Sequence, residues 1–136
     1  MTRLIYCCGC LKKVEARLTD GKEIYKTDKY KSLPFWKCDT CKNFVGCHHK
    51  TKERTKPLGC IPSPEIKNAR KHIHALLDPL WQMSGSKRKA RTVLYDMIGK
   101  KMGRLPYHTA NIRSIEEARK VYRVILDLKK TIINFY

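Results

Sequence analysis

Four cysteines in the first third of the chain have the spacing of a metal site. Two residues separate Cys7 from Cys10 and Cys38 from Cys41, and 27 residues lie between the pairs. Each C-x-x-C turn holds two thiolates close together, so two turns can complete a shell of four sulfurs around Zn²⁺ at about 2.3 Å per bond. Chance clustering of thiols or a pair of disulfides fits the spacing less well. The sequence therefore predicts a structural zinc site formed by Cys7, Cys10, Cys38 and Cys41.

A second group of candidate ligands follows the fourth cysteine. Cys47, His48, His49 and Cys60 could form a mixed cysteine and histidine site with His72 or His74, although their spacing is irregular. The alternatives are an adjunct role beside the first site and ordinary loop histidines. Cys47, His48 and Cys60 are therefore possible second metal ligands or adjuncts, and Cys8 is expected to be a bystander thiol.

The sequence offers no strong catalytic pattern. Cys47 and His48 are adjacent, and neighbouring side chains of an extended segment point to opposite sides, so they are a poor nucleophile and base pair. Paired carboxylates, a Walker loop and an H-E-x-x-H helix are missing from the sequence. A metal-dependent nuclease is a less favoured alternative. We expect a protein that is not an enzyme and takes no small-molecule substrate.

The chain is strongly basic. It has 30 Lys and Arg against 12 Asp and Glu, which gives a formal net charge of +18, and both halves carry the excess. A small domain needs a net charge of only about 2–8 to stay in solution, so the surplus indicates a polyanionic partner, either nucleic acid or a nucleoprotein. The predicted partner-binding residues are Lys87, Arg88, Lys89, Arg91, Lys100, Lys101 and Arg104. A solvated helix face explains any one of these runs equally well.

The elements around the cysteines read as a zinc ribbon or a treble-clef-like module. Residues 14–18 alternate apolar and charged side chains, and a turn at Asp20-Gly21 followed by Ile24-Tyr25 indicates a β-hairpin. Strands at 35–37 and 44–45 are expected on either side of the second cysteine pair. Aromatic residues of this module could stack on bases or fill its core: Tyr25, Tyr30, Phe35 and Trp36.

Three helices are predicted after a basic loop at residues 46–62. The first begins at the cap Ser63 with Pro64 and Glu65, and Pro79 should kink it or end it early. The second follows the Ser-Gly-Ser segment at 84–86 and ends near Gly103, and the third begins at the capping box of Ser114. The predicted fold is α+β, with a zinc-binding β module at 1–62 and a helical region at 63–136 packed on it.

Four motifs between residues 7 and 81 carry a family resemblance. They are Trp36-Lys-Cys38-Asp-Thr-Cys41, Phe44-Val45-Gly46-Cys47-His48, Pro57-Leu58-Gly59 and Asp78-Pro79-Leu80-Trp81. In these motifs the chain resembles a family of small zinc-finger-containing domains found in bacteria and their phages. The resemblance implies zinc and the order of ribbon, loop and helix, but no reaction. Cys8, His49, Cys60 and the dense basic residues of the tail depart from the pattern.

Charge and resemblance together suggest two functions. The first is a non-enzymatic zinc-binding protein, of phage or prophage type, that binds nucleic acid or a nucleoprotein through its basic surface. The alternative is an anti-CRISPR-like inhibitor that binds a host defence nuclease, such as a Cas effector, and blocks its nucleic-acid loading. An odd number of cysteines and no recognisable signal peptide lead us to expect a cytoplasmic location. A helix that spans a membrane needs about 20 consecutive apolar residues, and no apolar stretch of the sequence approaches that length.

Overall fold

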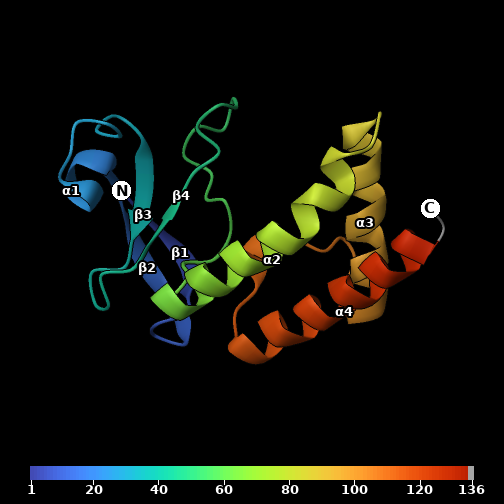
Figure 1. The fold of residues 1–136 in the computed structure, drawn as a ribbon. Coiled ribbons are helices and arrows are strands. Elements are labelled where there is room, and N and C mark those ends of the chain that lie inside the picture. Colours follow the sequence, from blue (N-terminus) through green and yellow to red (C-terminus); the bar gives the residue numbers. More distant parts are fainter. Residues whose placement is uncertain (135–136) are drawn as a thin grey trace. The chain divides into compact units, whose positions relative to one another are not determined.

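The computed structural model describes residues 1–134 and divides into two compact units. The first unit is Met1–Ile66 and holds all the strands, and the second begins at Lys67 and is helical (Figure 1). The α+β class predicted from the sequence is confirmed. The packing of the helical region on the β module stays a prediction.

The first unit is built on a four-stranded antiparallel sheet with strand order β1-β2-β3-β4. The strands are β1 (Thr2–Cys7), β2 (Lys12–Asp20), β3 (Pro34–Lys37) and β4 (Phe44–Gly46). In this register Cys7 lies opposite Lys12, Arg17 opposite Lys37, and Trp36 opposite Val45. β2 and β3 are the two inner strands, and β2 lies between β1 and β3.

The predicted hairpin turn at Asp20-Gly21 is wrong. The chain forms a short helix there, α1 (Gly21–Tyr25), because the carboxylate of Asp20 accepts a hydrogen bond from the backbone N–H of Glu23 at 3.1 Å and caps the helix. Ile24 and Tyr25 belong to this helix and form no strand. The hairpin partner of β2 is instead β1, a strand that the sequence patterns do not predict.

The core of the sheet unit combines cysteines with a few apolar side chains. Trp36 is 2% exposed, and its indole Nε1 donates a hydrogen bond to the carbonyl oxygen of Thr55 at 2.6 Å. The other buried members are Ile5, Cys7, Ala16, Cys38, Val45, Cys47 and Ile61. Three of these eight buried residues are cysteines, so few large apolar groups stabilise the sheet.

The three predicted helices are present. They are α2 (Pro64–Gln82), α3 (Lys87–Met102) and α4 (Ile115–Asn134). The Ser63 and Ser114 hydroxyls accept hydrogen bonds from backbone N–H groups three residues on, at 3.3 and 3.1 Å, so both predicted caps are confirmed. Gly103 ends α3 with a φ of 77°, the left-handed conformation that glycine adopts without strain.

Pro79 does not end α2, contrary to one of the two expected outcomes. The helix continues for three more residues to Gln82. The carboxylate of Asp78 accepts a hydrogen bond from Trp81 Nε1 at 3.0 Å and lies 3.3 Å from Nδ1 of His74. These side-chain contacts link the turns on either side of the proline, where its missing N–H removes a backbone hydrogen bond.

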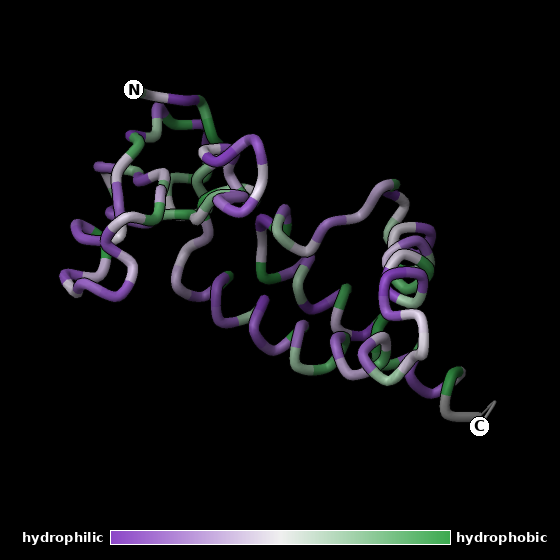
Figure 2. Tube along the Cα trace, turned by 90° about the horizontal axis from the view of Figure 1, so that it is seen from above, coloured by the Kyte–Doolittle hydropathy of each residue, from purple (hydrophilic) through white to green (hydrophobic). Residues whose placement is uncertain are grey.

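The helical unit has an ordinary apolar core. Hydrophobic and hydrophilic residues alternate along its helices (Figure 2), which is the pattern of helices buried on one side. The buried residues are Ile73, Leu77, Leu94, Ile98, Tyr107, Ile112, Ala118, Val121, Ile125 and Leu128. Within residues 1–134, no helix combines the length and the apolar character needed to cross a membrane.

Gly21 has no room for a side chain, which makes it a test of the α1 turn. A Cβ at this position would overlap the carbonyl oxygen of Tyr30, whereas a Cβ on Gly85 would meet nothing within 4 Å. We expect Gly21→Ala to destabilise the sheet unit by about 3 kcal/mol, at the upper end of overpacking costs. Urea titrations of zinc-loaded protein will measure this loss of stability, with the transfer of zinc to a chromophoric chelator as the signal for unfolding of the sheet unit. Gly85→Ala is the control, and equal midpoints for both variants would contradict the close packing of Gly21 against Tyr30.

Candidate functional site

The ends of two strands bring the four predicted ligands together. Cys7 is the last residue of β1 and Cys10 lies in the turn that follows. Cys38 comes directly after β3, and Cys41 lies in the turn that leads to β4. Each pair thus sits where a strand turns, and β2 lies between the two strands that deliver the pairs.

The four sulfurs fit a zinc ion. All four Sγ atoms lie within 4.8 Å of one another, with 3.3 Å between those of Cys7 and Cys41 and 3.6 Å between those of Cys10 and Cys38. A tetrahedral shell with bonds of about 2.3 Å places its sulfurs about 3.8 Å apart. Four thiolates without a labile ligand make a closed, structural site, and zinc is the ion that such sites prefer.

The backbone of both turns is shaped for metal binding. The residue after each second cysteine is left-handed, with φ of 57° at Leu11 and 67° at Lys42, although neither is glycine. In the second turn the N–H of Lys42 donates to the carbonyl of Cys38 at 2.8 Å. In the first turn a Cβ on Gly9 would approach Cys41 Sγ to 3.2 Å, so a residue without a side chain leaves space for the sulfurs.

The thiols of the site differ in acidity. Burial raises the pKa of Cys7 to about 12, and the hydrogen bond with Cys41 adds to this effect. Burial acts in the same direction on Cys38, but hydrogen bonds from the backbone of Cys41 and Thr40 outweigh it and lower the pKa of Cys38 to about 7. Zinc must therefore displace a proton from at least Cys7 at neutral pH, so acidification opposes zinc binding.

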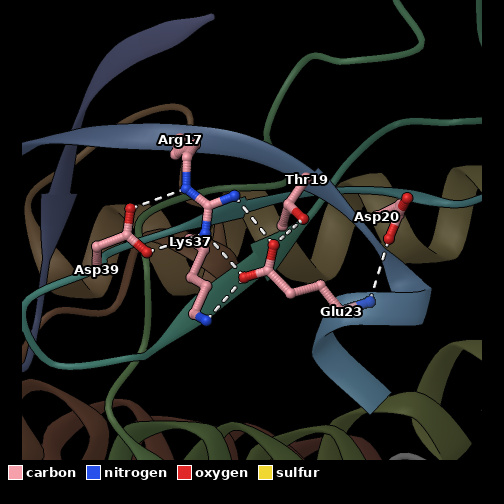
Figure 3. A network of polar contacts seen from close by, with 6 residues as sticks. All are labelled: Arg17, Thr19, Asp20, Glu23, Lys37 and Asp39. Carbon is pink, nitrogen blue, oxygen red and sulfur yellow. Dashed lines mark hydrogen bonds and ion pairs between the residues drawn. The ribbon is translucent and has the colours of Figure 1, made fainter. Parts of the chain in front are cut away.

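A network of charged side chains supports the second cysteine pair (Figure 3). Arg17, on the inner strand β2, binds both oxygens of Asp39 at 2.9 and 3.0 Å, and Asp39 lies between Cys38 and Cys41. The same guanidinium binds both oxygens of Glu23 in α1 at 3.0 and 2.8 Å. Paired contacts of this kind are strongly directional, so they position the turn relative to β2.

The carboxylates of the network are held in their charged form. The hydrogen bonds from Arg17 lower the pKa of Asp39, and those from Arg17 and then Lys37 and Thr19 lower the pKa of Glu23. Because both pKa values are depressed, the network stabilises the fold above the ordinary carboxyl pKa of about 4. That contribution is lost as the pH falls through the depressed values.

A comparison with protein families agrees with this geometry. The model of a family described as a zinc-finger-containing domain matches residues 3–128. The chain belongs to this family of zinc-finger-containing domains. The match extends beyond residues 7–81, where the sequence motifs lie, and includes most of the helical unit. No curated protein and no solved structure matches the chain.

The second cysteine group of this zinc-finger-containing domain has a different arrangement. Within residues 1–134, the four-cysteine cluster is the only group in which three or more candidate ligand atoms converge. Cys47, His48 and Cys60 therefore do not form a second cluster of ligands. Cys47 is buried in the core, which raises the pKa of its thiol, and the backbone of His48 bonds to Lys56. A second ion there stays a prediction.

Sequence reasoning missed a contact of Cys8. Its buried Sγ lies 3.8 Å from that of Cys60, and its backbone N–H donates to Ile61 at 2.9 Å. The end of the basic loop is therefore joined to the first zinc turn. Only a three-dimensional structure brings these residues together, because 52 positions separate the two cysteines.

The predicted partner-binding residues fall into two groups. Lys100 and Arg104 contact carboxylates, Asp96 at 3.2 Å and Glu117 at 2.8 Å respectively. The other five have no ion pair among residues 1–134: Lys87, Arg88, Lys89, Arg91 and Lys101. Of the aromatic residues expected to stack on bases, Tyr25, Tyr30 and Phe35 pack against each other's rings, and Trp36 is core.

The metal site predicts different effects for a cysteine that is a zinc ligand, Cys38, and for one that is not, Cys8. Cys38→Ser removes a ligand, so we expect loss of bound zinc and of the ordered sheet, because structural zinc contributes on the order of 10 kcal/mol in such modules. Cys8→Ser should keep one zinc ion per chain. Native mass spectrometry counts the ion, and amide hydrogen exchange reports on the sheet. A zinc-free but ordered Cys38→Ser variant would contradict this assignment, and two ions in the unmodified chain would support a second site near Cys47.

The charged network predicts that the Arg17 side chain slows the release of zinc. Arg17→Met frees the turn that carries Asp39, so we expect zinc to transfer to a chelator about tenfold faster, the lower end of what residues that orient metal ligands contribute. Lys22→Met removes an exposed charge from the same unit and serves as the control. Identical release rates for the two variants at neutral pH would show that the network does not support the site.

Proposed function

We propose that this zinc-finger-containing domain is a non-enzymatic protein that binds nucleic acid or a nucleoprotein through basic residues of α3. The observation that supports this most is the lack of carboxylate partners around Lys87, Arg88, Lys89 and Arg91 among residues 1–134. We call these four residues the α3 basic run. Unpaired, exposed cations bind phosphates without first breaking an internal ion pair.

The position of the α3 basic run adds to the argument. It occupies the first turns of the helix, where backbone N–H groups already create a partial positive charge. That turn contains no acidic residue, and Ser86 makes no capping hydrogen bond with its side chain. By contrast, α4 begins with Glu116 and Glu117. The start of α3 is thus electrostatically unfavourable in isolation, and a bound polyanion would relieve the repulsion.

The rest of the molecule suits a binding role. The formal net charge of +18 favours association with any polyanion, and four thiolates bound to one zinc ion would lower it by only about two. The closed four-cysteine site leaves zinc no open position for substrate, so its role in this proposal is to hold the sheet together. The helical surface then carries the binding.

A second hypothesis is that the chain inhibits a host defence nuclease, because a basic protein can also occupy the acidic surface or the nucleic-acid channel of such an effector. This hypothesis would place the chain among proteins of phage or prophage type. Both hypotheses use the same basic surface, but the second predicts binding to the effector protein itself. The experiment below separates the two.

The test measures nucleic-acid binding as a function of salt. If six to ten phosphates are engaged, affinity should fall by about 10³–10⁵ between 50 and 200 mM salt. The double variant Lys87→Glu, Lys89→Glu should abolish binding at low salt and keep its zinc. The matched control Lys50→Glu, Lys52→Glu makes the same change of charge at exposed positions of the basic loop.

Three results are informative. Loss of binding in the α3 variant alone supports the α3 basic run as the interface. Equal loss in both variants would mean that net charge, and no particular surface, governs the interaction. If the unmodified protein binds no nucleic acid, the proposal is wrong, and co-purification with an effector nuclease whose cleavage it blocks would favour the inhibitor.

A further inference from the structure

A cavity of about 390 Å³ opens beside the α3 basic run in the helical unit. One wall comes from α3, with Arg88, Arg91 and Tyr95, and the other from the segment at 105–108, with Tyr107 and His108. This volume lies in the range of small-ligand sites, which is about 300–1,000 Å³. Cationic groups and aromatic rings thus share one concave site.

Arg91 is held at this cavity by two aromatic rings. Its guanidinium carbon lies 5.7 Å from the ring centroid of Trp81 and 5.4 Å from that of Tyr95, which are cation–π distances. No carboxylate pairs with Arg91 in the part of the chain that the structure describes. Stacking fixes the plane of the guanidinium and leaves its N–H groups for a ligand.

A chain of hydrogen bonds fixes the two rings themselves. Trp81 Nε1 donates to Asp78 at 3.0 Å, and Asp78 also contacts Nδ1 of His74 at 3.3 Å. On its other side, Nε2 of His74 lies 3.1 Å from the hydroxyl of Thr109, which is 3.4 Å from that of Tyr95. Thr109, at the centre of this chain, is buried, whereas His74 and Asp78 are partly exposed. The site is therefore organised before any ligand arrives.

The charges of the cavity favour an anion. Asp96, the one acid in its wall, is neutralised by Lys100 at 3.2 Å. The phenol of Tyr107 donates to Glu117, which also pairs with Arg104, so these charges balance each other. Arg88 and Arg91 remain as uncompensated cations. A ligand with a phosphate and a flat apolar part matches this combination.

We call the cavity lined by Arg88, Arg91 and Tyr95 the Arg91 cavity. We propose that it binds one unpaired nucleotide of a single-stranded nucleic acid, with the phosphate at Arg88 and Arg91 and the base against Tyr95. This inference rests on the proposed function and adds to it the type of strand. In a duplex the bases are stacked and paired, so they cannot enter a side cavity, whereas an unpaired base can rotate into one. Stacking on tyrosine is also tolerant of base identity.

The test compares two strands of equal charge. One is an eight-nucleotide oligodeoxythymidylate, and the other has the same number of phosphates on an abasic backbone. We expect fluorescence anisotropy at about 50 mM salt to show about tenfold tighter binding of the strand with bases. Phosphate contacts are the same for both strands, so the ratio of the two affinities reports on contacts with the bases.

Substitutions then assign the preference to the cavity. Tyr95→Leu removes the ring that contacts the base, so it should reduce the ratio toward one. Arg91→Lys keeps the charge but loses the flat, multidentate group that holds the phosphate, so it should weaken the binding of both strands. Tyr95→Phe keeps the ring and should keep the ratio. Arg123→Lys is a matched control on α4, and Lys89→Gln should weaken both strands equally. Circular dichroism and one zinc ion per chain confirm that each variant is folded.

The outcomes separate this inference from the proposed function. If the unmodified protein binds both strands equally, the cavity is no base site, while binding of nucleic acid through the α3 basic run stands. A preference for bases that survives Tyr95→Leu would also overturn the inference. If neither strand nor a duplex binds, both proposals are wrong.

Discussion

The bonds from four thiolates to one zinc ion are the interaction on which the sheet unit depends. Cys7 ends β1 and Cys38 follows β3, and these strands are not neighbours, because β2 lies between them. The ion therefore links the two flanking strands across the central one. With cysteines as three of its eight buried core residues, the sheet has little apolar surface to replace that link.

Electrostatics complement the metal on the same strands. Arg17 projects from β2 and reaches Asp39 inside the second cysteine turn, while its contacts with Glu23 attach α1 to the same point. The strand that contributes no ligand is thus connected to the site by charge. Exposed ion pairs alone add little to the free energy of unfolding. The main effect of this network is therefore to orient the turn that carries two of the zinc ligands.

Local patterns predicted what depends on neighbouring residues, and little beyond. The zinc ligands, the Ser63 and Ser114 caps and the Gly103 helix end each follow from spacing or from one residue's chemistry. The Asp20-Gly21 pair misled the prediction, because the same residues start a helix as readily as a turn. The contacts of Cys8 with Cys60 and of Arg91 with the Trp81 ring depend on tertiary packing, which no local signal encodes, whereas Tyr95 is a local i,i+4 partner of Arg91.

The two kinds of chemistry in this chain are separable. All seven cysteines lie at or before Cys60, and the buried core of the helical unit contains none of them. Its stability comes from apolar side chains, and the Arg91 cavity is organised by aromatic rings and neutral hydrogen bonds within the same unit. Zinc shapes the sheet, whereas the core beneath α3 is built from apolar side chains. The four-cysteine zinc site and the proposed polyanion-binding surface therefore lie in different compact units of the molecule.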